Sequence, residues 1–300
     1  MDPANTTTGG HWLHNVNGLG NMYSFLVYDL ADHRTMDLPL LHNPVWIASC
    51  LSLYLLLVLR LVPKWMEDRK PFQLRELSII YDAFQICGSA TSIYLFFKHG
   101  WRWDFFWECK GPDFSNDEHS IGFARAAYFT YLLKMTELIE TVMYAMRKKN
   151  NQISFFHVYH HCYAVITSHG FAKYGGGSML SYTIIVNSIV HVFMYSYYLS
   201  SIFAKQLPFS LVPFKKVITI LQITQLTSVL VNLCYAMSAS CSVPLLHCVF
   251  HGPNMALQIK LFADFYASRY KPKQQPASQT TESREALLDK TQKEVKQKQM

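Results

Sequence analysis

The chain alternates between long apolar blocks and short polar connections, and this pattern predicts helices that cross a membrane. The clearest block runs from Val45 to Val62 and consists almost entirely of leucine, isoleucine, valine and aromatic residues. A helix needs about 20 consecutive apolar residues to cross the hydrocarbon core of a bilayer. We therefore expect an all-α membrane protein with seven transmembrane helices, at about residues 44–62, 77–98, 125–146, 153–172, 178–204, 214–238 and 243–268.

Composition supports one membrane domain rather than two soluble ones. Half of the 300 residues are hydrophobic and only 16% are charged, which is low for a soluble protein. The net charge of +7 could suggest a nucleic-acid partner. The basic residues instead lie in short connections between apolar blocks, as in membrane proteins. We therefore expect the protein to lie in a lipid bilayer and not to bind nucleic acid.

Every second connection is basic, which predicts that these connections are cytoplasmic. The N-terminus is then lumenal or extracellular, where Asn5 begins a glycosylation sequon. The same topology places Cys109 and Cys241 on lumenal connections, where an oxidising compartment permits a disulfide between them. The basic connections contain Lys64, Arg69, Lys70 and Arg75; Arg147, Lys148 and Lys149; Lys205, Lys215 and Lys216; and Arg269, Lys271 and Lys273.

The two ends of the chain differ in composition from the membrane domain. We expect residues 1–43 to form a lumenal segment, residues 44–270 the helical domain, and residues 271–300 a disordered basic tail in the cytoplasm. Lys296 and Lys298 stand at the fifth and third positions from the end. This arrangement resembles a dilysine retrieval signal of endoplasmic reticulum membrane proteins.

Three histidines are clustered in the fourth apolar block. His157, His160 and His161 are spaced i, i+3 and i+4, so they share one face of a helix. Ionisable side chains at membrane depth are costly and usually mark a functional site. A lone histidine would more often hydrogen-bond a neighbouring helix, but three together favour a site.

Polar stripes on other predicted helices lie at matching depths. With a rise of 1.5 Å per residue, Lys134 and His191 lie about 20 Å from the cytoplasmic helix ends, and the three histidines at about 8–14 Å. These levels predict an internal cavity that opens to the cytosol. A purely structural salt bridge between Lys134 and Glu137 is an equally good interpretation of that pair. The stripes comprise Lys134, Glu137, Glu140 and Thr141; Asn187, His191, Met194, Tyr195 and Tyr198; Thr219, Gln222 and Gln225; and Asn254, Gln258 and Lys260.

Four ordered motifs resemble those of the ELO family, the very-long-chain fatty acid elongases or 3-oxoacyl-CoA synthases of the endoplasmic reticulum. The family usually has Asp where this chain has Glu140 and Leu where it has Phe156. The matching motifs are Lys134-x-x-Glu137-x-x-Glu140-Thr141, Gln152-x-x-Phe155-Phe156-His157-x-Tyr159-His160-His161, Asn187-x-x-x-His191-x-x-Met194-Tyr195-x-Tyr197-Tyr198 and Thr219-x-x-Gln222-x-x-Gln225.

The resemblance implies a fold and a reaction. Six of seven helices would form a barrel around an acyl and CoA tunnel, with the first helix outside. The reaction would condense a long-chain acyl-CoA with malonyl-CoA, without a cofactor, and release CO2 and coenzyme A. Reductase and dehydratase enzymes would act on the product, and a homodimer is compatible with this fold.

The resemblance also implies roles for particular residues. His160 would accept the acyl group and His191 would assist it, while His157 and His161 position it or act as base. Asn187 would orient His191. The expected substrate-binding residues are Lys134, Glu137, Tyr195, Tyr198, Gln222 and Gln225, with Arg147, Lys148, Lys149 and Lys260 for the CoA phosphates. For the three adjacent cations, the positive-inside bias is a sufficient alternative explanation.

Two other functions fit part of the pattern. His-x-x-His-His is also an iron-ligand pattern of membrane di-iron desaturases and hydroxylases, but such a site needs about eight imidazoles in several boxes. The chain has one box and the scattered His169, His191, His247 and His251. A seven-helix receptor or transporter would have the expected number of spans, but it does not predict polar stripes that converge around histidines.

Overall fold

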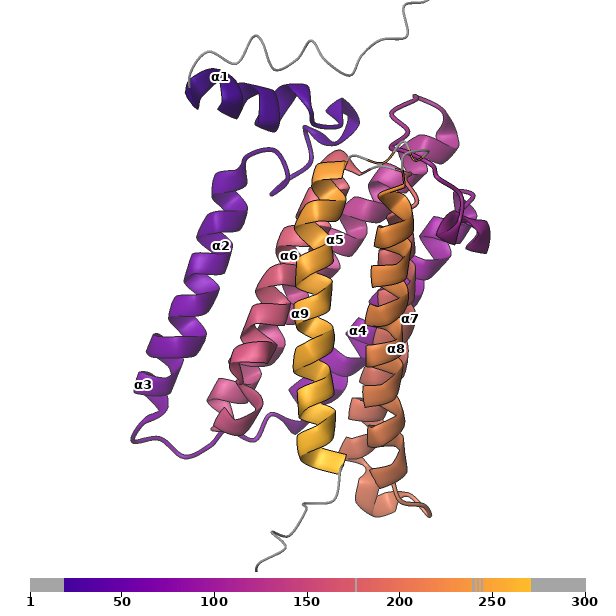
Figure 1. Cartoon of the computed structure of the whole chain (residues 1–300). Coiled ribbons are helices and arrows are strands. Elements are labelled where there is room, and N and C mark those ends of the chain that lie inside the picture. Colours follow the sequence, from indigo (N-terminus) through magenta and orange to yellow (C-terminus); the bar gives the residue numbers. More distant parts are fainter. Residues whose placement is uncertain (1–18, 176, 239–240, 242, 244, 271–300) are drawn as a thin grey trace, which may run out of the picture. The chain divides into compact units, whose positions relative to one another are not determined.

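The computed structural model describes residues 19–175, 177–238, 241, 243 and 245–270 (Figure 1). Within these ranges every regular element is a helix, and none is a β-strand. The short elements are α1 (Leu19–Ser24), the π-helical turn η2 (Phe25–Asp29) and the 3-10 turns η3 (His33–Thr35), η5 (Trp103–Phe106), η6 (Asn150–Gln152) and η7 (Ala204–Gln206). The longer elements are α2 (Pro44–Leu56), the π-helical segment η4 (Leu57–Leu61), α3 (Val62–Met66), α4 (Arg75–Lys98), α5 (Glu118–Met146), α6 (Phe155–Tyr174), α7 (Ser181–Ile202), α8 (Val212–Ala236) and α9 (Leu245–Tyr270).

Each of the seven apolar blocks coincides with a long helical stretch. The first block is covered by α2, η4 and α3, which follow one another without a break. This stretch, Pro44–Met66, and helix α8 are both long and apolar enough to cross a membrane. Helix α5 begins earlier than expected, because Asp117 caps it by accepting a hydrogen bond from the Ser120 backbone N–H at 3.0 Å.

Helices that are distant in the sequence pack together through small and polar residues. Helix α4 contacts α7 and α5, while α5 contacts α6 and α7 contacts α8. The hydroxyls of Ser92 on α4 and Thr130 on α5 are 2.7 Å apart. Gly88 lets α4 approach Leu133, since an added Cβ would lie 2.5 Å from that side chain. Small residues and hydroxyl pairs of this kind are common at helix contacts inside membranes.

The described residues form two compact units, one ending at Phe262 and the next beginning at Ala263, within α9. The histidines and the polar stripes of the predicted site all belong to the first unit.

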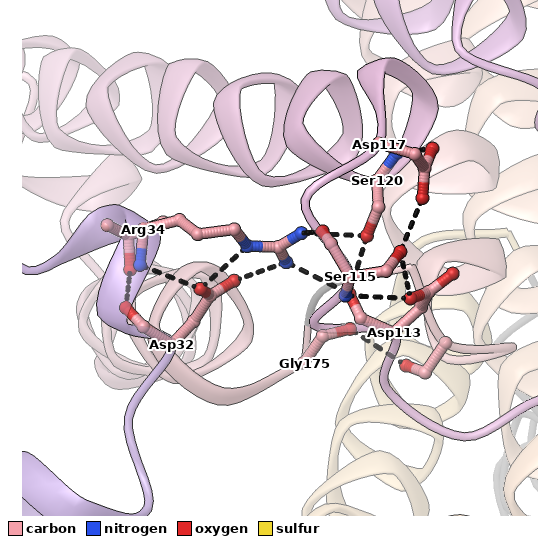
Figure 2. A network of polar contacts seen from close by, with 9 residues as sticks. Asp32, Arg34, Asp113, Ser115, Asp117, Ser120 and Gly175 are labelled. Atoms are coloured by element: carbon pink, nitrogen blue, oxygen red, sulfur yellow. Dashed lines mark hydrogen bonds and ion pairs between the residues drawn. The ribbon is translucent and has the colours of Figure 1, made fainter.

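An ion-paired network, which we call the Arg34 clasp, joins the N-terminal segment to the loop before α5 (Figure 2). The Arg34 guanidinium donates to the Asp32 carboxylate at 2.9 and 2.6 Å. It also donates to the Asp113 carbonyl at 2.9 Å, to the Ser120 hydroxyl at 2.8 Å and to the Ser115 carbonyl. The hydrogen bond with Asp32 raises the pKa of Arg34 above its usual value. These contacts add polar anchors to a segment whose Leu41 is also buried in the hydrophobic core.

Cys109 and Cys241, the pair expected to lie on one side of the membrane, are joined by a disulfide. The bond connects the loop after η5 to the segment between α8 and α9, across 132 positions of sequence. In the chain-entropy view, closing a loop of roughly 100 residues destabilises the unfolded chain by about 4–5 kcal/mol. The loops at this end of the helices are therefore constrained covalently as well as by the Arg34 clasp.

Candidate active site

The histidine cluster lies in the first two turns of α6. Ser154 caps this helix, because its hydroxyl accepts a hydrogen bond from the His157 backbone N–H at 3.2 Å. The helix therefore starts immediately before the cluster, and its register places the three imidazoles on neighbouring faces. The rings of His157 and His161 lie 4.4 Å apart, and those of His160 and His161 5.8 Å apart.

A buried charged triad lies between α5 and α7. Lys134 Nζ is 2.8 Å from Glu137 Oε1, and the same oxygen is 3.0 Å from His191 Nδ1. Lys134 Nζ also lies 3.4 Å from His191 Nδ1. All three residues are buried, and Glu137 is only 1% exposed. Lys134 and His191 thus occupy one level of the structure, as their distances from the helix ends predict.

A second carboxylate faces the other end of the cluster. Glu140 accepts hydrogen bonds from the hydroxyls of Tyr144, at 2.5 Å, and Tyr195, at 3.4 Å. Its Oε2 also lies 3.9 Å from His161 Nε2. Tyr195 is fully buried, and its ring packs against Tyr198. The longer glutamate at this position therefore reaches the histidine cluster without leaving its carboxylate unpaired.

His157 is connected to the first helical stretch through Thr141. The Thr141 hydroxyl lies 3.0 Å from His157 Nε2 and accepts a hydrogen bond of 2.9 Å from the Tyr54 hydroxyl on α2. Thr141 is completely buried. One hydroxyl therefore links α2, α5 and α6 beside the imidazole.

His160 lines a cavity of about 100 Å³. Its Nδ1 lies 2.8 Å from Gln258 Oε1 on α9. Lys134, Asn187 and Gln225 line the same space, so α5, α6, α7, α8 and α9 each contribute a polar side chain to it. A cavity thus lies between these helices and brings His160 and the triad lysine to one space, while its opening to the cytosol stays a prediction.

The remaining expected residues lie at varying distances from this cavity. Gln222 donates to the Met194 sulfur at 3.5 Å and is not among the lining residues. Arg147, at the end of α5, lies 3.5 Å from the Ser78 hydroxyl, and Lys148 donates to the Glu67 carbonyl at 3.0 Å. Lys149 is half-buried, which lowers its pKa, and Lys260 is exposed on α9. Asn5, Lys296 and Lys298 lie outside the described residues.

The sequence places Gln258 in a polar stripe with Asn254 but gives it no role, whereas in the structure its side-chain oxygen lies 2.8 Å from His160 Nδ1. The spacing of four residues, which puts Asn254 and Gln258 on one face of α9, was the available signal. Asn254 contacts α6 beside the cluster, since its side-chain oxygen accepts a hydrogen bond from the Tyr159 hydroxyl. Within the described residues, no group of three or more histidine, cysteine, aspartate or glutamate side chains could hold a metal ion.

Comparisons with known proteins identify the family. The profile of the ELO family, described as GNS1/SUR4, matches residues 39–278. The chain is 33% identical over 257 residues to very long chain fatty acid elongase 4 of Mus musculus, which covers 84% of this chain and 81% of that protein. It is 38% identical over 178 residues to elongase 1 of Mus musculus, covering 59% of this chain and 63% of that protein. It is 30% identical over 246 residues to elongase 7 of Drosophila melanogaster, covering 82% of this chain and 74% of that protein. The chain therefore belongs to the ELO (GNS1/SUR4) family, the membrane-embedded very long chain fatty acid elongases.

Proposed function

We propose that this elongase transfers a long acyl chain from acyl-CoA to His160 and then to a carbon nucleophile made from malonyl-CoA. The product is a 3-oxoacyl-CoA, and the by-products are CO2 and free coenzyme A. The observation that supports this assignment most strongly is the cavity in which His160 faces Lys134, the lysine of a buried triad with Glu137 and His191. Cation and imidazole are the groups that an acyl transfer followed by decarboxylation requires.

Acyl transfer begins at His160. Because the Gln258 amide oxygen accepts from Nδ1, that nitrogen carries the proton and Nε2 has a free lone pair. Nε2 attacks the thioester carbonyl, the C–S bond breaks, and the coenzyme A thiolate leaves and takes a proton from water, while His160 becomes an acyl-imidazolium. The acyl group is then held on His160 beside the remaining lining residues.

Condensation uses the charged triad. When the malonyl group loses CO2, the electron pair of the broken C–C bond becomes an enolate, and the Lys134 ammonium and His191 stabilise its oxygen. The enolate carbon attacks the acyl carbonyl, the bond to His160 breaks, and the 3-oxoacyl-CoA is released. Glu137 fixes His191 through Nδ1, and Asn187 lies one turn away on the same helix.

The finer topology belongs to the same proposal. The seven long helical stretches cross the endoplasmic reticulum membrane, and six of them surround the tunnel while the stretch Pro44–Met66 lies outside. The N-terminus and the Cys109–Cys241 bond are lumenal, and the basic loops and Lys260 bind the CoA phosphates from the cytosol. Membrane-bound reductase and dehydratase enzymes consume the 3-oxoacyl product.

A radiochemical assay tests the assignment. Membranes that contain the full chain receive labelled malonyl-CoA and a long-chain acyl-CoA without a nicotinamide reductant, so that the 3-oxoacyl product accumulates. We expect His160→Ala and His191→Ala each to lower the rate by about 10²–10⁴-fold. His119→Ala, at an exposed position near the start of α5, is the matched control. Full activity in both the His160 and the His191 variants would overturn the assignment.

Mass spectrometry gives a second readout that does not depend on turnover. Incubation with acyl-CoA alone should leave an acyl group on the peptide that contains His160. The acyl group should disappear when malonyl-CoA is added. An acyl group on another residue, with the His160 peptide unmodified, would contradict the proposed intermediate.

A further inference from the structure

One apolar space of the molecule is not used by the proposed reaction. This space, which we call the α2 groove, lies between α2, α6 and α9 and has a volume of about 430 Å³. Ile47 and Leu51 of α2 form one wall, and Gly170 of α6 and Phe250 of α9 lie opposite. His160 lines the cavity of the candidate active site but does not line this groove.

The groove is present because α2 packs loosely on the helices beside it. The continuation of α2 through η4 and α3 packs on α5, whereas α2 itself packs less closely on α6 and α9. Near its end α2 is held to α5 by the Tyr54 hydroxyl, which donates to Thr141 at 2.9 Å. Gly170 adds to the space, since a side chain there would meet no atom within 4 Å.

The groove is open to the surroundings of the protein. Ile166 and Phe250 line it and are 42% and 53% exposed. Because the stretch Pro44–Met66 is long and apolar enough to cross a membrane, these surroundings are lipid. Protein interiors contain few voids larger than a water molecule. An apolar space of this size that opens to lipid is therefore filled by lipid.

The three walls of the groove lie at one depth in the membrane. With a rise of 1.5 Å per residue, Ile47 lies about 5 Å from the start of α2, His169 about 8 Å from the end of α6 and Phe250 about 8 Å from the start of α9. The polar layer on each side of a bilayer is roughly 5–8 Å thick. The groove therefore begins at the boundary between headgroups and hydrocarbon, which is where the ester carbonyls of glycerophospholipids lie.

A buried histidine provides a polar atom at this depth. His169 lines the groove and is only 8% exposed, and its Nε2 has no hydrogen-bond partner among the described residues. A buried polar atom without a partner is costly unless a ligand uses it. An imidazole N–H can donate to a carbonyl oxygen. Among the described residues that line the groove, none is lysine, arginine, aspartate or glutamate, so the site suits a neutral ester rather than an ionised carboxylate.

We propose that the α2 groove binds one acyl chain of a membrane glycerophospholipid, whose ester carbonyl accepts a hydrogen bond from His169 Nε2. The chain covers Ile47 and Leu51, while the glycerol and the headgroup stay at the membrane surface. The lipid completes the packing between α2 and α6 where protein atoms leave space. It is a bound partner of the fold and is distinct from the acyl-CoA that reacts at His160.

Native mass spectrometry of the full chain, taken from phosphatidylcholine vesicles into detergent and washed, tests this proposal. We expect one phosphatidylcholine to be retained by the wild-type protein. Gly170→Leu fills the groove and should lower the retained fraction at least about tenfold. His169→Leu removes one hydrogen bond and should lower it about 3–10-fold, whereas His169→Gln keeps a donor and should retain more lipid. Ser49→Leu, at an exposed position of α2 outside the groove, should leave retention unchanged.

Photolabelling in the same vesicles locates the bound lipid. A phosphatidylcholine with a photoreactive group near the carboxyl end of one chain should label Ile47 and Leu51 more strongly than Val231. That valine is exposed on α8, about 8 Å from the helix end, so it reports contact with bulk lipid at a matched depth. Gly170→Leu should lower the labelling of the groove to the level of Val231. Ala48→Leu, which fills the groove from the other wall, should do the same.

Three results would overturn the proposal. One is equal labelling of the groove and of Val231 in the wild-type protein. Another is lipid retention and labelling that neither filled variant changes. The third is displacement of the retained phosphatidylcholine by a long-chain acyl-CoA, because the groove would then bind substrate.

Discussion

The molecule contains two ion-paired networks that differ in whether all of their polar atoms form hydrogen bonds. In the Arg34 clasp, all three guanidinium nitrogens donate hydrogen bonds, and both Asp32 oxygens accept (Figure 2). In the buried triad, Glu137 Oε2 has no hydrogen-bond partner among the described residues, and neither does the neighbouring His161 Nδ1. A saturated network fixes structure, whereas buried polar atoms without partners are costly unless a ligand uses them. By this criterion the clasp is a structural network, while the triad keeps an acceptor that the ligand of the proposed function could use.

The largest effect is expected from removing one charge of the triad. Glu137→Ala leaves the Lys134 ammonium buried without its carboxylate, which should cost about 3–5 kcal/mol of unfolding free energy and abolish condensation. The double variant Lys134→Met with Glu137→Leu replaces both charges with apolar groups of similar volume. It should regain most of the stability but stay at least about 100-fold less active. Thermal unfolding and the rate of product formation are measured for both variants. Product formation at the wild-type rate in the double variant would show that the pair is only a structural salt bridge.

The Arg34 clasp should show the opposite behaviour. Arg34→Met leaves the buried Asp32 carboxylate without its cation and should lower the unfolding free energy by about 3 kcal/mol. The condensation rate per folded molecule should be retained. Arg102→Met is the matched control, because its partners Asp104 and Glu108 lie at 3.8 and 3.6 Å and are exposed. That control should cost less than about 1 kcal/mol. A lower rate in correctly folded Arg34→Met protein would mean that the clasp also serves the reaction.

A smaller effect should follow at the contact between His160 and Gln258. Gln258→Leu removes the acceptor that fixes the imidazole, and we expect the condensation rate to fall about tenfold, or about 1.4 kcal/mol of activation free energy. Gln258→Glu keeps an acceptor facing Nδ1 and should retain more of the rate than Gln258→Leu. If the two variants were equally slow at unchanged stability, the hydrogen bond would not be what positions His160.

The smallest effect is expected from lowering the pH, which should reduce the stability that Asp113 contributes to the clasp. The Ser115 backbone N–H and hydroxyl donate to Asp113 and hold the pKa of its carboxyl below the usual value. This stabilisation is complete above the ordinary aspartate pKa of about 4 and is lost as the pH falls through the lower value of the folded protein. Because Asp113 is partly exposed, we expect a loss of less than about 1 kcal/mol. Unfolding curves between pH 7 and pH 3 should show a smaller decline for Asp113→Asn.

The helices were predictable because membrane burial requires long apolar stretches, and each of the seven blocks became a long helical stretch. The start of α5 was not, since Glu118, His119 and Ser120 are polar and the helix depends there on the Asp117 cap. Hydropathy detects long apolar stretches, and it does not detect a polar first turn that a capping side chain stabilises. The clasp was missed because two of the partners of Arg34 are the backbone carbonyls of Asp113 and Ser115, and Ser120 lies 86 positions away in the sequence.

The depth of the site residues along their helices was predictable from the sequence, but which helices face one another across the cavity was not. Counting residues placed Lys134 and His191 at one level, and their nitrogens lie 3.4 Å apart. The same count could not say which helix faces His160, because the order of helices around a cavity is set by packing between distant segments. The contact between Gln258 and His160 was missed for this reason, since it depends on where α9 lies relative to α6.

The hydroxyl chain from Tyr54 through Thr141 to His157 couples the position of α2 to the orientation of an imidazole. Thr141 can donate its single proton to His157 Nε2 while it accepts from Tyr54, so the two bonds form in one direction. A shift of α2 by about 1 Å would stretch the first bond beyond normal hydrogen-bond length and release the threonine to rotate. Removing the Tyr54 hydroxyl, which does not line the cavity, should therefore loosen the orientation of the His157 ring.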